Sequence, residues 1–252
     1  MSHRAHDYRH LIERWRTVGK KIGVPLKKLV VADGYQLFSL VTPALRETGG
    51  IYVSAGIHGD EPGSTEGLIT WAEKQGRRLA KIPLLILPCL NPWGLVGNLR
   101  LNAKGLDLNR SFHLLEEPMV AAVRRLVGQR QFGISMMLHE DYDGQGVYLY
   151  EVQRVKPFWG EALLGAAAEH VPIDPRTWID GRKAVNGIHR RRIDRKRFEK
   201  IGHPEALWLH WEHSARTFTF ETPSEFALER RVAAHGAVMD ECVRRIAAAG
   251  RI

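Results

Sequence analysis

The fold is decided by the stretch Ile51-Tyr52-Val53-Ser54-Ala55-Gly56-Ile57-His58-Gly59-Asp60-Glu61-Pro62-Gly63. Its first five residues form a short apolar run, which predicts a buried strand. The glycines that follow allow the backbone to turn sharply, and we expect a helix from about residue 64 to residue 79. The stretch therefore predicts a strand, a loop that holds a histidine and a glutamate, and a helix.

Strand-like and helical segments alternate on both sides of this unit. The runs 29–32 and 36–42 flank the turn Asp33-Gly34 and predict a hairpin at one sheet edge. Further strands are expected at 82–90, 133–138, 147–152 and 217–220, and further helices at 7–20, 118–127, 160–169 and 227–249. The alternation predicts an α/β fold, a three-layer α/β/α sandwich with a mixed, largely parallel central sheet.

Length and composition predict a single catalytic domain over residues 1–252. Hydrophobic residues make up 44% of the chain and charged residues 26%, as in ordinary soluble globular proteins. The stretch 174–213 has no clean period, so we expect it to form a basic insertion on the rim of the domain. No apolar run reaches the roughly 18 residues of a membrane helix, and the N-terminus lacks a signal-peptide core. We therefore expect a cytoplasmic protein without membrane contact.

The two cysteines are far apart in the sequence. Cys89 lies in an apolar run and Cys242 in a helical pattern. Thiols in such positions are expected to be buried core residues rather than disulfide or metal partners. A structural thiolate metal site is therefore not expected.

Positive charge is concentrated in residues 182–200, which supply most of the formal net charge of +9. The basic residues there are Arg182, Lys183, Arg190, Arg191, Arg192, Arg195, Lys196, Arg197 and Lys200. Such a cluster can meet nucleic acid, an anionic substrate or a membrane surface, or it can be a solvated segment. If it lines a cleft, it should steer anionic substrates, and reversing residues 190–192 to glutamate should raise KM.

Polar side chains follow four of the apolar runs. They are His58, Asn91, His139 and Glu221. Because the carboxyl ends of parallel strands line up along one edge of an open α/β sheet, we expect these groups to converge in one cleft.

Two histidines and one glutamate of this region suit a catalytic zinc ion. His58 and Glu61 are three residues apart, which lets both face one ion, and His139 supplies a third ligand from a distant strand. Three protein ligands leave a position for water, as in catalytic zinc sites. Glu221 ends an apolar strand, where partial desolvation raises a carboxylate pKa, and it is the candidate general base.

Five ordered pieces of the chain resemble the zinc carboxypeptidase family and the related succinylglutamate desuccinylase/aspartoacylase group. The pieces are His58-Gly59-Asp60-Glu61, Asn91-Pro92-Trp93-Gly94, Arg100 with Gly105-Leu106-Asp107-Leu108-Asn109-Arg110, Leu138-His139-Glu140-Asp141, and Phe220-Glu221. The resemblance spans about residues 51–223. It implies a zinc-carboxypeptidase-like fold with one zinc ion per chain.

The resemblance also implies roles for individual residues. His58, Glu61 and His139 would bind zinc, and Glu221 would act as general base and then protonate the leaving amine. Arg100 would stabilise the oxyanion together with zinc. Asn109 and Arg110 would grip a substrate carboxylate, which the geometry of an amide and a guanidinium fork suits.

The chain departs from this family in one respect. Carboxypeptidases carry a mobile tyrosine before the catalytic glutamate, whereas residues 153–220 contain no tyrosine. Tyr148 and Tyr150 follow the third ligand closely, where they have two candidate uses, lining the cleft or packing in a strand, and strand packing is the one we expect. The tyrosine role therefore has no candidate, and the substrate is less defined than the chemistry.

Three functions remain after these observations. The favoured one is a zinc-dependent metallocarboxypeptidase that hydrolyses a C-terminal amide bond of a small peptide, with cell-wall peptides as candidate substrates. The alternative is an N-acyl amino acid amidohydrolase, since either substrate offers a free carboxylate. A nucleic-acid-binding protein that uses residues 182–200 is the third, and no binding motif supports it. The intact Glu221 and Arg100 disfavour an inactive relative, and the oligomeric state is open.

Overall fold

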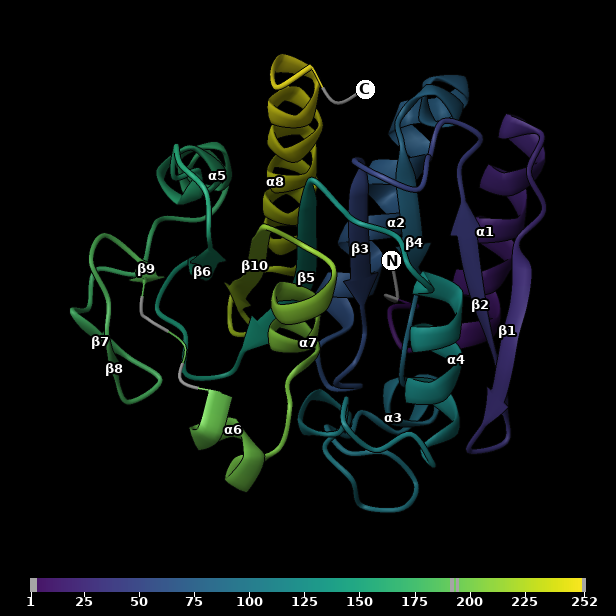
Figure 1. Cartoon of the computed structure of the whole chain (residues 1–252), viewed down its shortest axis with the longest axis horizontal. Helices are drawn as coiled ribbons and strands as arrows, with labels where there is room; N and C mark the ends of the chain where they lie inside the picture. Colours follow the sequence, from purple (N-terminus) through teal and green to yellow (C-terminus); the bar gives the residue numbers. More distant parts are fainter. Residues whose placement is uncertain (1–3, 191–192, 194, 251–252) are drawn as a thin grey trace.

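The computed structural model describes residues 4–190, 193 and 195–250. In these residues an eight-stranded sheet has the order β1-β2-β4-β3-β5-β10-β6-β9 (Figure 1). Its strands are β1 (Lys27–Ala32), β2 (Tyr35–Val41), β3 (Ile51–Ala55), β4 (Leu84–Leu87), β5 (Ile134–Asp141), β6 (Tyr148–Gln153), β9 (Ile188–Arg190) and β10 (Arg216–Pro223). A separate small hairpin pairs β7 (Trp178–Ile179) with β8 (Arg182–Lys183).

The sheet is mixed and has a parallel centre. Strands β4, β3, β5 and β10 run parallel to one another, and β9 is parallel to β6. The pairs β1–β2, β2–β4 and β10–β6 are antiparallel. The predicted mixed, largely parallel sheet and its antiparallel edge hairpin are therefore confirmed.

Helices cover both faces of this sheet (Figure 1). One apolar cluster joins the sheet to α1 (Tyr8–Ile22), α2 (Pro62–Gln75), α5 (Gly160–Ala168) and α8 (Leu228–Ala248). A second cluster joins it to α4 (Pro118–Val127) and α7 (Glu205–Glu212). Because strand side chains alternate, Val53 belongs to the first cluster and its neighbour Tyr52 to the second. The shorter helices are α3 (Pro92–Gly97), α6 (Arg195–Ile201), η1 (Gly76–Lys81) and η2 (Leu108–Arg110).

Two strands extend further than the apolar runs predict. His139 lies inside β5 and Glu221 inside β10, and the two residues pair directly in the parallel register. An apolar run marks only the part of a strand that packs in the core, whereas the backbone ladder continues into the polar part. Both side chains are therefore held by the sheet and not by a loop.

The region 174–213 includes ordered short elements. Strand β9 extends the sheet beyond β6, and Trp208 and Leu209 of α7 belong to the second core cluster. The two- and three-residue strands are too short to show a period, so the sequence pattern did not reveal them. The single-domain organisation and the bounds of a rim insertion stay predictions.

Both cysteines agree with their prediction as core residues. Cys89 and Cys242 are buried and free, and both belong to the first apolar cluster. Among the described residues, no helix combines the length and the hydropathy that crossing a membrane requires. The cytoplasmic location stays a prediction.

Candidate metal centre and pocket

Three buried side chains from two distant segments of the chain meet at the carboxyl edge of the sheet. His58 lies in the loop after β3, Glu61 is the N-cap residue of α2, and His139 lies on β5. One potential ligand atom from each side chain lies within 4.8 Å of the others. The structure thus brings together the three residues that the sequence singled out as metal ligands.

The orientation of the rings fits metal binding. Nδ1 of His58 lies 2.5 Å from Oε1 of Glu61, and Nδ1 of His139 lies 2.9 Å from Oε2 of the same carboxylate. Nε2 of His58 lies 3.2 Å from Oδ1 of Asp107. A metal-binding histidine usually donates its other ring N–H to a carboxylate, which leaves the facing nitrogen free for the ion. The donor set of two imidazoles and one carboxylate suits zinc.

Electrostatics favour a cation at this cluster. Burial lowers the pKa of His58, but the Glu61 and Asp107 carboxylates outweigh burial and raise this pKa to about 9. Burial likewise opposes ionisation of Glu61, yet the two imidazoles hold its pKa well below the usual range. The cluster therefore stabilises positive charge next to Glu61. A divalent cation supplies this charge in exchange for the imidazole protons.

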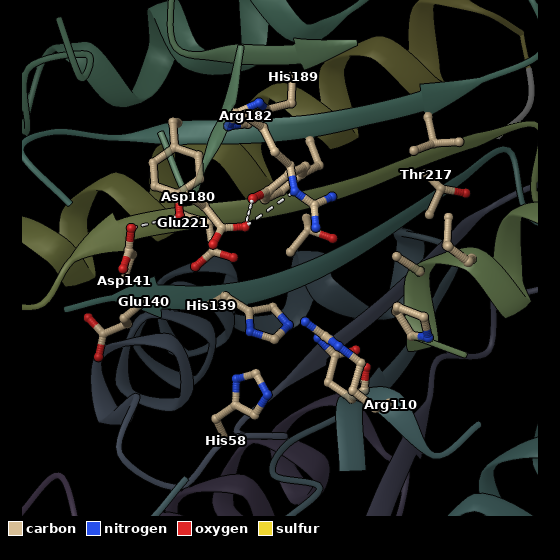
Figure 2. A pocket seen from close by; sticks show the side chains of 18 of the residues that line it. His58, Arg110, His139, Glu140, Asp141, Asp180, Arg182, His189, Thr217 and Glu221 are labelled. Carbon is tan, nitrogen blue, oxygen red and sulfur yellow. Dashed lines mark hydrogen bonds and ion pairs between the residues drawn. The ribbon is translucent and has the colours of Figure 1, made fainter. Parts of the chain in front are cut away.

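Glu221 faces the same pocket as the metal cluster (Figure 2). Its strand places it directly beside His139. Burial, together with the Glu61 and Asp141 charges, raises the pKa of Glu221 to about 8, and the positive charges of His139 and Arg100 oppose this rise. A carboxyl with such a pKa can both accept and donate a proton near neutral pH.

Arg100, Asn109 and Arg110 also line the pocket. The Arg100 guanidinium lies 3.8 Å from Glu61 and donates to Asp107 at 3.1 Å. Asn109 accepts a bond from the backbone N–H of Glu205 through its side-chain oxygen. The structure therefore places all seven predicted site residues in one pocket of about 210 Å³.

Asn91 differs from the expectation for strand-end residues. It is buried but does not line the pocket. Its Oδ1 accepts from the N–H of Gly94 and caps α3, while its Nδ2 donates to the carbonyls of Arg100 and Leu101. The prediction that Asn91 converges in the cleft is wrong, because its side chain turns to the loop that holds Arg100.

The pocket is also lined by residues that the predicted site did not include, among them the two tyrosines for which strand packing was the expected use. Tyr148 donates to Asp141 at 2.8 Å, and Tyr150 donates to Asp180 at 2.6 Å. Asp180 and Arg182 belong to the β7–β8 hairpin and point into the pocket (Figure 2). The tyrosines thus pack in the sheet and also face the pocket. The sequence pattern that indicates this orientation is the alternation of the tyrosines with apolar residues along β6, which places both tyrosines on one face of the strand.

Asp107 is the most direct omission from the predicted site. Its carboxylate contacts His58 and Arg100, and it also accepts from the backbone N–H of Asn109. The residue lies inside the Gly105–Arg110 piece, two positions before Asn109. Its place in that piece was visible, but only the folded loop shows that it contacts both a candidate ligand and Arg100.

Two arginines of the predicted basic cluster, Arg182 and Arg190, lie in different environments in the structure. Arg190 is bound by Glu151 and by Glu161, at 2.6 Å from the latter, whereas Arg182 lines the pocket. Residues 191–192 lie outside the described part of the chain. Arg190 therefore belongs to an ion-pair network, and reversing its charge would disturb that network before it changed substrate steering.

Sequence comparison identifies one matching family. Residues 47–129 match the succinylglutamate desuccinylase/aspartoacylase catalytic domain. This segment contains His58, Glu61, Arg100, Asn109 and Arg110. No curated protein sequence matched the chain.

Solved structures show a similar architecture over almost the whole chain. A protein from Shewanella amazonensis SB2B, assigned as a metallopeptidase, has a TM-score of 0.83 at 21% identity and covers 96% of this chain and 94% of its own. The metallo-carboxypeptidase from Burkholderia cenocepacia has a TM-score of 0.73 at 19% identity, with 96% and 69% covered. The chain has a carboxypeptidase-like α/β fold. The murein-tripeptide amidase from Escherichia coli O157 shares this fold, with a TM-score of 0.59 at 18% identity and 87% and 90% covered.

The carboxypeptidase-like fold confirms the resemblance that the five sequence pieces indicated. The family match adds the desuccinylase/aspartoacylase group, which the sequence also resembled. The family match supports a hydrolase, and the solved structures show the fold.

Proposed function

We propose that this chain is a zinc-dependent metallocarboxypeptidase that hydrolyses a C-terminal amide bond of a small peptide, with a cell-wall peptide as candidate substrate. One observation carries the proposal. The buried cluster of His58, Glu61 and His139 shares a pocket with Glu221, whose raised pKa suits proton transfer. Metal ligands and a protonatable carboxyl in one pocket are the requirements of metal-assisted amide hydrolysis.

The cluster of His58, Glu61 and His139 would hold the zinc ion. Zinc bound there would supply a Lewis acid for the scissile carbonyl and lower the pKa of a water molecule. Glu221 accepts the proton of the attacking water and returns it to the leaving amine, which its pKa near neutrality permits.

The basic side chains of the pocket bind and orient the substrate. Arg110 and Asn109 supply a guanidinium fork and an amide for a free carboxylate. Arg100 is fixed by Asp107 and lies next to Glu61. Its guanidinium stabilises negative charge that develops on the carbonyl oxygen.

The similar structures are consistent with this substrate class. A metallo-carboxypeptidase from Pseudomonas aeruginosa with this fold binds (2-guanidinoethylmercapto)succinic acid, a molecule with two carboxylates. The murein-tripeptide amidase from Escherichia coli O157 acts, by its name, on a cell-wall peptide. These proteins are the reason to include cell-wall peptides among the candidates.

A second candidate function is hydrolysis of an N-acyl amino acid. The match of residues 47–129 to the desuccinylase/aspartoacylase catalytic domain favours it. Both functions would use the same metal site, and both would use Asn109 and Arg110 to bind a free carboxylate of the substrate.

A substrate panel separates the two functions. Zinc-loaded protein would be tested on peptides with a free C-terminus, on the same peptides with an amidated C-terminus, and on N-acyl amino acids. We expect turnover of the free peptides alone. The variant Glu221→Gln should keep its zinc while kcat falls by about 10²–10⁴-fold, because the proton acceptor is lost. Turnover of only the N-acyl amino acids would select the second candidate, and turnover of neither class would contradict both.

A further inference from the structure

The carboxylate of Glu140 is buried next to the metal cluster but points away from it. Glu140 follows His139 on β5, and successive side chains of a strand point to opposite faces. Its side chain is completely shielded from solvent. The chemistry proposed above gives this residue no role, so its burial needs another reason.

Glu140 connects the strand to the start of α2. Its Oε2 accepts a bond of 2.6 Å from the backbone N–H of Gly63. Its own backbone N–H donates to Oε2 of Glu61 at 3.2 Å. The side chain and the main chain of one residue therefore hold both the ligand Glu61 and the helix that begins after it.

Other groups hold the Glu140 carboxylate in this place. Arg231 of α8 donates to Oε1 at 2.5 Å, and the hydroxyl of Thr222 on β10 donates to the same oxygen at 3.1 Å. The positive charge of Arg231 compensates the buried negative charge. Elements β5, β10, α2 and α8 thus meet at a single carboxylate.

The start of α2 needs such a partner because its own N-cap side chain is used elsewhere. An N-cap side chain normally accepts from the backbone N–H of the second or third helical residue. Glu61 makes no such bond and turns to the two imidazoles. Pro62 has no N–H, so Gly63 supplies the first donor, and Glu140 accepts from it. A Cβ at Gly63 would lie 2.3 Å from the Glu140 carboxylate, which explains the glycine.

We infer that Glu140 is a positioning residue of the metal centre, which ties the start of α2 to β5 and so holds Glu61 at ligand distance from His58 and His139. This inference rests on the proposed zinc-dependent function. Residues behind the metal ligands fix ligand geometry, and their loss commonly weakens metal binding by about 10–100-fold.

Glu151 provides a matched control within the same chain. It is a buried strand glutamate that accepts from the backbone N–H groups of Trp159 and Gly160 at the start of α5, at 2.8 and 3.0 Å. An arginine, Arg190, also binds its second oxygen. Glu151 therefore has the same architecture as Glu140 but contacts no candidate metal ligand. A purely structural role would make the two residues equivalent.

The test compares Glu140→Gln with Glu151→Gln in the full chain. The zinc dissociation constant would be measured by competition with a chromophoric chelator, and the melting temperature of the metal-free protein would be measured in parallel. We expect both variants to lose stability, whereas only Glu140→Gln weakens zinc binding, by about tenfold. Glu140→Asp and Glu151→Asp form a second pair of variants. They keep the negative charge but shorten the side chain by one methylene group. We expect the same contrast in this pair, which replaces the glutamine pair if that does not fold.

The possible outcomes are distinct. Wild-type zinc affinity in the Glu140 variants, or an equal loss in the Glu151 variants, would overturn the positioning role and leave the proposed function intact. A wild-type protein that binds no zinc would contradict the proposed function and the positioning role together.

Discussion

At the scale of single residues, the chemistry of the site depends on the His58 ring, because its two nitrogens face different carboxylates. Nδ1 faces Glu61 and Nε2 faces Asp107. The arrangement fixes which nitrogen is available to a metal. The sequence predicted His58 and Glu61 as ligands from their spacing, but the contact with Asp107 spans a long stretch of chain and could not be predicted.

The variant Asp107→Asn tests whether the Asp107 carboxylate strengthens His58 as a metal ligand. A neutral amide makes the His58 ring a weaker donor to the ion, so we expect zinc binding to weaken by about tenfold. The variant should remain folded, because Asn retains an acceptor for the backbone N–H of Asn109. Chelator competition measures the effect, and an unchanged dissociation constant would show that Asp107 does not tune the site.

Glu221 makes a pH-dependent contribution to the stability of the metal-free protein. Its ordinary pKa of 4.5 is raised to about 8 by burial, with the Glu61 and Asp141 charges adding to the effect. Between these values the folded state holds a proton that the unfolded state releases. The free energy of unfolding should therefore fall as pH rises through this window.

Comparison with Glu221→Gln isolates this contribution. The glutamine does not titrate, so the variant should gain stability relative to wild type as pH rises from about 4.5 to 8, with no further change outside this range. Urea unfolding in the presence of a chelator, repeated at several pH values, measures the difference. Parallel stability curves for the two proteins would contradict a raised pKa at Glu221.

At the scale of helices and strands, long elements were predictable and short ones were not. Strands β3 and β5 each contain a continuous apolar run, and α4 was predicted with the bounds that the structure shows. The hairpin β7–β8 and strand β9 have two or three residues each, which cannot display a period. Their positions depend on contacts with β6 and with the pocket, and such contacts leave no local pattern.

Asn91 shows how one element supports the site from outside the pocket. It caps α3 and holds the carbonyls of Arg100 and Leu101. The variant Asn91→Ala should lower the free energy of unfolding by about 2 kcal/mol, since a cap and further hydrogen bonds are lost. We also expect kcat to fall while zinc stays bound, because the Arg100 loop loses its anchor.

Asp7 is the control for this prediction. It caps α1 by accepting from the N–H of His10 and does not line the pocket. Asp7→Ala should cost about 1 kcal/mol of stability without changing kcat. Equal kcat values in both alanine variants would show that the Asn91 bonds serve stability alone.

At the scale of the whole molecule, the parallel sheet explains why distant residues meet. Ligands bind where the strands of an open α/β sheet end at their carboxyl edge. Strands β3, β5 and β10 lie next to one another in the sheet (Figure 1), and they bring His58, His139 and Glu221 into one pocket at this edge (Figure 2). This convergence was predictable from the sequence. The distribution of positive charge was not, because the partners of Arg190 lie on β6 and α5.

The central claim is that His58, Glu61 and His139 hold one zinc ion per chain. Elemental analysis of metal content in wild type, His58→Ala and His139→Ala tests it most directly, with His170→Ala as a histidine variant outside the cluster. We predict about one zinc per chain in wild type and in His170→Ala, and loss of zinc in the two cluster variants. Wild-type protein without zinc after dialysis against zinc, or full zinc content in the cluster variants, would contradict the claim.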